Sequence, residues 1–113
     1  MGRGPRGLAE VVGKMSLPLV LSPQAVRDTN KAKVYYAAIS IPLALAFVDE
    51  LSTTLRFIQE HPKGGVLIRR SIRQFPVERF PYVVVYAIHR DMIRIVRVFH
   101  TRRNPTRKLR AEG

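Results

Sequence analysis

The residues of this sequence that could act on a charged partner gather where its last apolar run ends. His100 is followed by Thr101, Arg102 and Arg103, directly after a stretch rich in Ile, Val and Phe. A histidine can give or take a proton near neutral pH, and arginines bind phosphates and carboxylates. We therefore place the candidate functional site at this junction.

Two kinds of chemistry remain open for this site. For catalysis, His100 is the candidate acid or base, and Glu78 is the nearby acidic residue that could serve as a carboxylate base. For binding, His100 is a hydrogen-bonded strand-end residue and the cations form a docking surface for a polyanion. The candidate cations of that surface are arginines of the second half of the chain: Arg70, Arg73, Arg79, Arg97, Arg102 and Arg103.

The charge of the chain supports a polyanionic partner. The 113 residues suit one domain and carry a formal net charge of +12. Residues 1–61 hold seven basic and five acidic side chains, whereas residues 62–113 hold thirteen and three. Such a field favours nucleic acid, an acidic protein segment or an anionic membrane surface. The alternative is a basic surface that serves solubility alone, but that purpose does not require the charge to concentrate in one half.

Several classes of protein are excluded or disfavoured by composition. The chain has no cysteine, so disulfides and thiolate zinc sites are excluded. Its three histidines are far apart in sequence, and we expect neither a metal nor a cofactor. The first twenty residues lack the apolar core of a secretory signal before Leu17. The most apolar stretch, 34–48, is interrupted by Ser40 and Pro42 and is too short to span a bilayer. We expect a cytoplasmic protein without a membrane partner.

The ends of the chain differ from its middle. Residues 1–14 are rich in Gly and Arg without sustained periodicity, which predicts a disordered leader. Met15 follows them directly, and we hypothesise that translation starts there. Residues 15–105 form the predicted domain, and residues 106–113 form a basic tail.

Two helices are predicted in the first half of the domain. Ser22-Pro23 is a helix start, with Ser as N-cap and Pro at the first helical position, and this helix should run to about Ser40. A second should run from Pro42 to about Glu60, and the short connection implies an antiparallel helical hairpin. Their predicted core faces are Ala25, Ala32, Tyr36 and Ile39, then Ala44, Phe47, Leu51, Leu55 and Ile58. Their predicted solvated residues include Arg27, Asp28, Lys31 and Lys33.

Strands are predicted at residues 17–21, 66–74, 82–89 and 92–100, where β-branched and aromatic residues gather. Residues 75–79 form a connection, and the last two strands form a hairpin. Tyr82 and Tyr86 fall on one face of their strand, where core packing is their expected role. The order strand, helix, helix, strand, strand, strand predicts an α+β domain. Its mostly antiparallel sheet of about four strands has the helical hairpin on one face and leaves the other for arginines and a partner.

Three motifs, set within this order of strands and helices, resemble those of the RelE/ParE superfamily, the plasmid stabilisation toxins of bacterial type II toxin–antitoxin systems. They are a Phe80-Pro81-Tyr82 segment leading to Tyr86, a Val98-Phe99-His100 segment leading to Arg102-Arg103-Asn104-Pro105, and a His61-Pro62-Lys63-Gly64 turn after the second helix. The resemblance implies a toxin that a cognate antitoxin neutralises in a hetero-oligomer. RelE-like members cut mRNA on the ribosome, whereas ParE-like members poison DNA gyrase without being enzymes.

Two departures from the RelE-like pattern bear on the choice between these activities. Ribonucleolytic relatives place an arginine three residues before the tyrosine that corresponds to Tyr86, and this chain has Val83 there. They also carry a tyrosine or lysine cluster near the C-terminus, and residues 106–113 contain no aromatic. We therefore expect a non-nucleolytic toxin that inhibits growth by docking a basic surface on gyrase. The alternatives are a metal-independent mRNA endonuclease and a basic RNA- or DNA-binding domain, such as a ribosome-associated protein.

Overall fold

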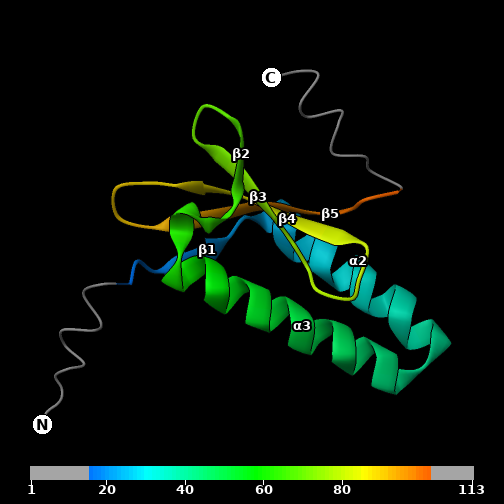
Figure 1. Ribbon diagram of the computed structural model, residues 1–113. Helices are drawn as coiled ribbons and strands as arrows, with labels where there is room; N and C mark the ends of the chain where they lie inside the picture. The colour runs from blue at the N-terminus through cyan, green and yellow to red at the C-terminus, as the bar shows by residue number, and fades with distance from the viewer. Residues whose placement is uncertain (1–15, 103–113) are drawn as a thin grey trace, which may run out of the picture.

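The structure is a computed structural model that describes residues 16–102. Its elements follow one another as β1 (Leu19–Leu21), α2 (Pro23–Ile39), α3 (Ile41–Glu60), the short 3-10 helix η1 (Pro62–Gly64), β2 (Val66–Arg69), β3 (Ile72–Pro76), β4 (Tyr82–Ile88) and β5 (Ile93–His100) (Figure 1). The predictions for residues 1–14, Met15, Arg103 and residues 106–113 lie outside the described residues. Within residues 16–102, no helix is long and apolar enough to cross a bilayer.

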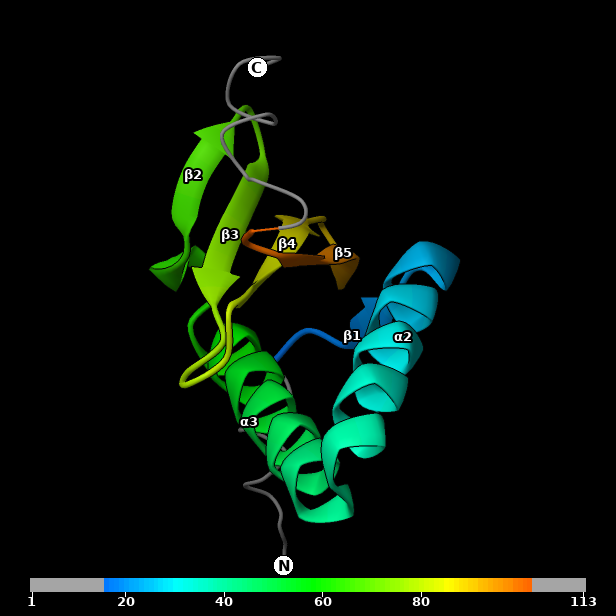
Figure 2. The ribbon, with the colours of Figure 1, turned by 90° about the vertical axis from the view of Figure 1, so that its right-hand side faces the viewer.

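The strands form a single sheet in the order β1-β5-β4-β3-β2. β1 runs parallel to β5, and the other neighbouring pairs are antiparallel. Helices α2 and α3 lie together on one side of the sheet, and the β2–β3 hairpin rises away from them (Figure 2). The α+β class and the predicted order of helices and strands are confirmed, but the sheet has five strands rather than about four.

The extra strand comes from the segment predicted as one strand over residues 66–74. That segment is a hairpin in which Arg69 pairs with Ile72 around a two-residue turn. Arg70 in this turn has a φ of 38°, in the left-handed region that most two-residue turns fill with Gly or Asn. Because Arg70 and Ser71 carry no such signal, the turn is invisible in the sequence. β3 also continues to Pro76, into the predicted connection.

Two serines set the boundaries of the helices. The Ser22 hydroxyl accepts a hydrogen bond from the Ala25 amide at 3.0 Å, with Pro23 at the first helical position. The Ser40 hydroxyl accepts one from the Leu43 amide, while the Ser40 amide donates to the Tyr36 carbonyl. Ser40 therefore ends one helix and begins the next, which forces the antiparallel hairpin predicted from the sequence. The predicted helix bounds are confirmed to within a residue.

The core lies between the helical hairpin and the sheet. Four aromatic rings form its centre, with centroids 5.1–6.3 Å apart: Tyr36, Phe47, Phe80 and Tyr82. Most of the predicted helical core residues are buried or partly buried here. Ile39 is the exception, with 60% of its surface exposed, because the helices extend beyond the sheet at their connected end (Figure 2).

Tyr86 ties η1 and the start of β2 to the centre of the sheet. Its buried hydroxyl donates to the Pro62 carbonyl at 2.7 Å and accepts from the Gly65 amide at 3.0 Å. Burial raises the pKa of Tyr86, although the Gly65 hydrogen bond and the charge of Arg73 act in the opposite direction. The expected core role of Tyr82 and Tyr86 is confirmed, since both are buried.

The close approach at Gly65 predicts a large effect of a single methyl group. A Cβ there would lie 2.5 Å from the Tyr86 hydroxyl and 2.8 Å from the Gln74 carbonyl oxygen. Gly65→Ala should therefore lower the free energy of unfolding by about 1–3 kcal/mol or more, because the backbone must move. At neighbouring Gly64 the nearest atom is a Phe57 ring carbon at 3.3 Å, so Gly64→Ala is the matched control. Urea unfolding measures both, and equal losses would contradict this account.

Candidate functional site

The predicted junction at the end of β5 is an ordered corner of the sheet. His100 pairs with Tyr82, and their rings meet edge to face with centroids 5.0 Å apart. The His100 Nδ1 accepts a hydrogen bond from the Arg102 amide at 3.1 Å. The Thr101 amide donates to the Pro81 carbonyl at 2.8 Å. These bonds hold His100 beside the start of β4, with Arg102 exposed next to it.

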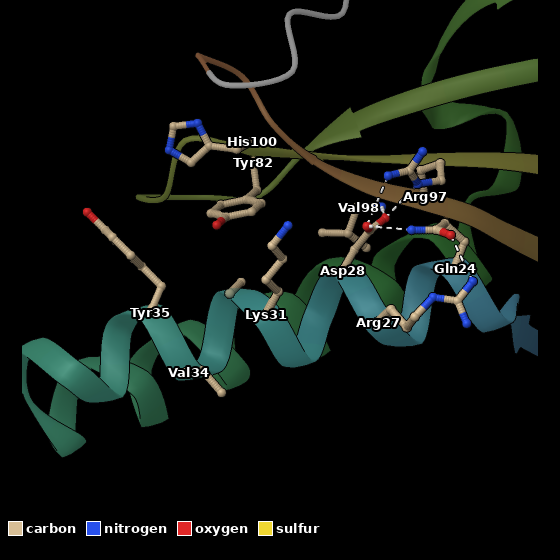
Figure 3. A pocket seen from close by; sticks show the side chains of 11 residues that line it. Gln24, Arg27, Asp28, Lys31, Val34, Tyr35, Tyr82, Arg97, Val98 and His100 are labelled. Atoms are coloured by element: carbon tan, nitrogen blue, oxygen red, sulfur yellow. Dashed lines mark hydrogen bonds and ion pairs between the residues drawn. The ribbon is translucent and has the colours of Figure 1, made fainter.

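A groove of about 630 Å³ separates this corner from helix α2 (Figure 3). Lys31 and Tyr35 extend from α2 toward Tyr82 and His100, while Arg27 projects from the same helix further along (Figure 3). The walls of the groove are formed by Gln24, Arg27, Asp28, Lys31, Ala32, Val34, Tyr35, Tyr82, Arg97, Val98 and His100. Sequence reasoning missed the contribution of α2, because polar helix residues look solvated until a neighbouring element is placed beside them.

One helix residue predicted to be solvated holds α2 against β5. Asp28 accepts two hydrogen bonds from the Arg97 guanidinium, at 2.8 and 3.0 Å, and a third from the Val98 amide at 2.9 Å. The side chain of Asp28 is only 11% exposed, so the prediction of a solvated residue is wrong. The Arg97 guanidinium also lies 4.4 Å from the centre of the Phe99 ring. Arg97 therefore joins two elements as well as facing the groove.

Opposing effects act on the ionisation of this pair. Burial alone would raise the pKa of Asp28, and this is the largest single effect on it. The hydrogen bonds from Arg97, Val98 and Gln24, together with the Arg97 charge, outweigh burial and lower the pKa of the carboxyl below its usual value. The hydrogen bond to Asp28 raises the pKa of Arg97. Both side chains therefore remain charged in the folded protein at neutral pH.

The other predicted arginines do not form one surface. Arg79 makes an ion pair with Glu50 at 2.8 Å. Arg73 pairs in register with Tyr86 and donates to the backbone carbonyl of Gly65 at 2.9 Å, which places it on the helix side. Arg70 is exposed in the β2–β3 turn, at the opposite end of the sheet from Arg102. Composition indicates how many cations there are, but tertiary contacts decide which of them are available.

Two further positions bear on acid–base chemistry at His100, namely Glu78 and Val83. Glu78 is exposed in the connection between β3 and β4. Among residues 16–102, no hydrogen bond joins its carboxylate to His100. Val83 is buried in β4 opposite Phe99, so an apolar side chain stands where the ribonucleolytic pattern has arginine. Among residues 16–102, no three His, Asp or Glu side chains gather as metal ligands.

Three exposed or partly exposed arginines at the far end of the sheet were absent from the predicted set. Arg69 ends β2, Arg90 lies in the β4–β5 turn and Arg94 lies in β5. They join Arg70, which was predicted. The sequence signal was present in the two basic turns, but it becomes meaningful only when strand pairing brings those turns to the same end of the sheet.

The Asp28 contact predicts a pH-dependent loss of stability. At neutral pH, Asp28→Asn should lower the free energy of unfolding by about 1.5–3 kcal/mol, the worth of hydrogen bonds to a charged group. Because the folded pKa lies below the usual 3.8, the stabilisation is complete above that value and disappears as pH falls through the folded pKa. The deficit of the variant should therefore shrink in acid.

Urea unfolding at pH 7 and in acid measures this difference. Asp49→Asn is the matched control, because Asp49 is an exposed carboxylate on α3. Losses of equal size in the two variants at pH 7, or a deficit that persists unchanged in acid, would contradict a structural role for the Asp28 carboxylate.

Comparison with known proteins gives a family and a fold. Residues 19–105 match the family model described as the ParE toxin of the type II toxin–antitoxin system parDE. Among solved structures, the chromosomal ParDE system from P. aeruginosa contains a similar chain, with a TM-score of 0.67 and 19% sequence identity. The match covers 76% of this chain and 97% of that chain. At this identity it shows a shared fold alone. A search of curated proteins finds no match.

Proposed function

We propose that this chain, which belongs to the family of ParE toxins of type II toxin–antitoxin systems, stops bacterial growth by docking on DNA gyrase. A cognate antitoxin neutralises it in this proposal. The observation that carries the proposal is the family match, which spans residues 19–105 and so covers every helix and strand of the domain. The proposed place of action is the cytoplasm, where gyrase and DNA are found.

The site supports a docking toxin rather than a nuclease. RNA cleavage needs an acid and a base that reach the same phosphate, with cations around it. Here Val83 is apolar in the middle of β4, Glu78 is exposed in the β3–β4 connection, and Arg79 and Arg97 each have a carboxylate partner. Folding leaves other arginines exposed, and those suit electrostatic contact with a macromolecule.

The groove between α2 and β5 is the proposed seat of the antitoxin. It combines the exposed cations Arg27 and Lys31 with the exposed apolar surface of Val34 and Tyr35. An antitoxin segment with alternating acidic and apolar side chains would complement both. The resulting complex is a hetero-oligomer.

Purified toxin tested against gyrase and against ribosomes separates the two activities. With gyrase, ATP and plasmid DNA, we expect inhibited supercoiling, and His100→Ala should leave that inhibition within about twofold because His100 performs no proton transfer in this proposal. With translating ribosomes we expect intact mRNA. Cleaved mRNA that His100→Ala prevents would overturn the proposal in favour of the endonuclease alternative. Harmless overexpression would instead favour a basic nucleic-acid-binding domain.

Charge reversal in the groove tests the antitoxin seat. The antitoxin candidate is the product of a small acidic reading frame beside this one, co-expressed with the full chain. Arg27→Glu combined with Lys31→Glu should weaken the complex by about tenfold or more, since like charges then face each other across the interface. Lys33→Glu combined with Arg56→Glu is the matched control, because both residues are exposed on the helices but do not line the groove. Titration by calorimetry measures both, and equal weakening would contradict this seat.

A further inference from the structure

Strand pairing brings four arginines together at one end of the sheet, opposite the corner that holds His100. Arg69 pairs with Ile72, Ile72 with Ala87, and Ala87 with Arg94, which makes one row across four strands. Directly paired residues share a face, so Arg69 and Arg94 flank this row on the same side of the sheet. With strands about 4.8 Å apart, their Cα atoms are separated by about 14 Å.

Two turns complete this cluster, which we call the arginine end: Arg69, Arg70, Arg90 and Arg94. Arg70 lies in the β2–β3 turn, at the upper left of the sheet in Figure 1, and Arg90 lies in the β4–β5 turn, lower down at the far left. Their side chains are exposed, as is that of Arg69. The β2–β3 hairpin projects beyond the helices (Figure 2), so the arginine end can approach a large partner without obstruction from α2 or α3.

The charge of the arginine end is not balanced within the described part of the chain. Arg79 and Arg97 make ion pairs with carboxylates, whereas none of the four arginines makes one with any residue from 16 to 102. Asp91, in the β4–β5 turn, is the carboxylate beside them in sequence, which leaves an excess of positive charge. Exposed guanidinium groups of one sign repel each other, and a polyanion relieves that repulsion.

The geometry points to duplex DNA, and we propose that the arginine end binds its phosphate backbone. A B-form major groove is about 12 Å wide, with a line of phosphates along each side. Arginines about 14 Å apart match two lines of phosphates across such a groove, whereas an acidic peptide offers one line of charge. The major groove of A-form RNA is deep and narrow, so its two lines of phosphates do not match this spacing, which selects DNA. The inference holds whichever enzyme the toxin inhibits.

Fluorescence anisotropy of the full chain with a labelled DNA duplex of about 20 base pairs tests the proposal over about 50–200 mM salt. The test variant combines Arg69→Gln, Arg70→Gln, Arg90→Gln and Arg94→Gln. Each lost phosphate contact should reduce the slope of log K against log salt by about 0.9, and the variant should bind at least ~30-fold more weakly at low salt. Arg70→Gln alone should lower the slope by about one contact.

A matched variant removes four cations from the helices instead: Arg27→Gln, Lys31→Gln, Lys33→Gln and Arg56→Gln, all of exposed residues. It loses the same charge, so it should bind DNA less than about threefold more weakly if the arginine end is the site. Equal losses in the two variants would overturn the proposal, because general charge would then explain binding. Circular dichroism melting checks folding, and Arg70→Gln and Arg90→Gln singly replace the fourfold variant if it unfolds.

Two competitors distinguish the alternative partners. Double-stranded RNA and polyglutamate are the competitors. If either binds as tightly as DNA, and if the fourfold variant weakens that binding equally, the assignment to duplex DNA is overturned. A fourfold variant that binds DNA normally yet still inhibits gyrase would overturn this inference and leave the proposed function standing. Conversely, the unaltered protein could have no effect on gyrase while the fourfold variant loses DNA binding. That result would support the inference and contradict the gyrase target.

Discussion

The contact between the Asp28 carboxylate and β5 is the constraint on which the arrangement of this domain depends. β1 ends at Leu21, and so β5 loses its neighbouring strand just beyond Ile95. Beyond that point, helix α2 and its N-cap supply the hydrogen bonds to this edge of β5. The Ser22 hydroxyl donates to the Val96 carbonyl at 2.8 Å, and the Asp28 carboxylate accepts from the Val98 amide. A carboxylate that is largely buried also requires a cation, which explains why Arg97 lies against the helix. The groove exists because this contact sets the helix beside the strand.

The sequence predicts those features that depend on local pattern. Helical periodicity, the Ser22 and Ser40 caps and the β-branched runs around 82–100 are local, and each proved correct. The Arg70 turn was missed because its left-handed residue is neither Gly nor Asn. The role of Asp28 was missed because Arg97 lies 69 residues away, and an acidic residue on a helix ordinarily faces water.

The candidate site shows the same limit in its electrostatics. A net charge of +12 predicts an electropositive surface, but it does not say which guanidinium groups remain free after folding. Arg79 and Arg97 are taken up by Glu50 and Asp28, while Arg69 and Arg94 are brought into one row by strand pairing. Exposed charge is thus found at the turns of the far end of the sheet as well as at the His100 corner, where Arg102 is exposed. Register decides this, and register is a property of the whole sheet.

The parallel pairing of β1 with β5 makes the order of synthesis matter. Leu19–Leu21 pair with Ile93–Ile95, so the first and last strands of the domain must meet across more than seventy residues of chain. Pairings of such long range are late and slow steps in folding, because the intervening chain must be ordered first. A nascent chain that has produced only the helical hairpin and β2–β3 has no second wall for the groove. The groove between α2 and β5 therefore forms only when translation of the domain is nearly finished.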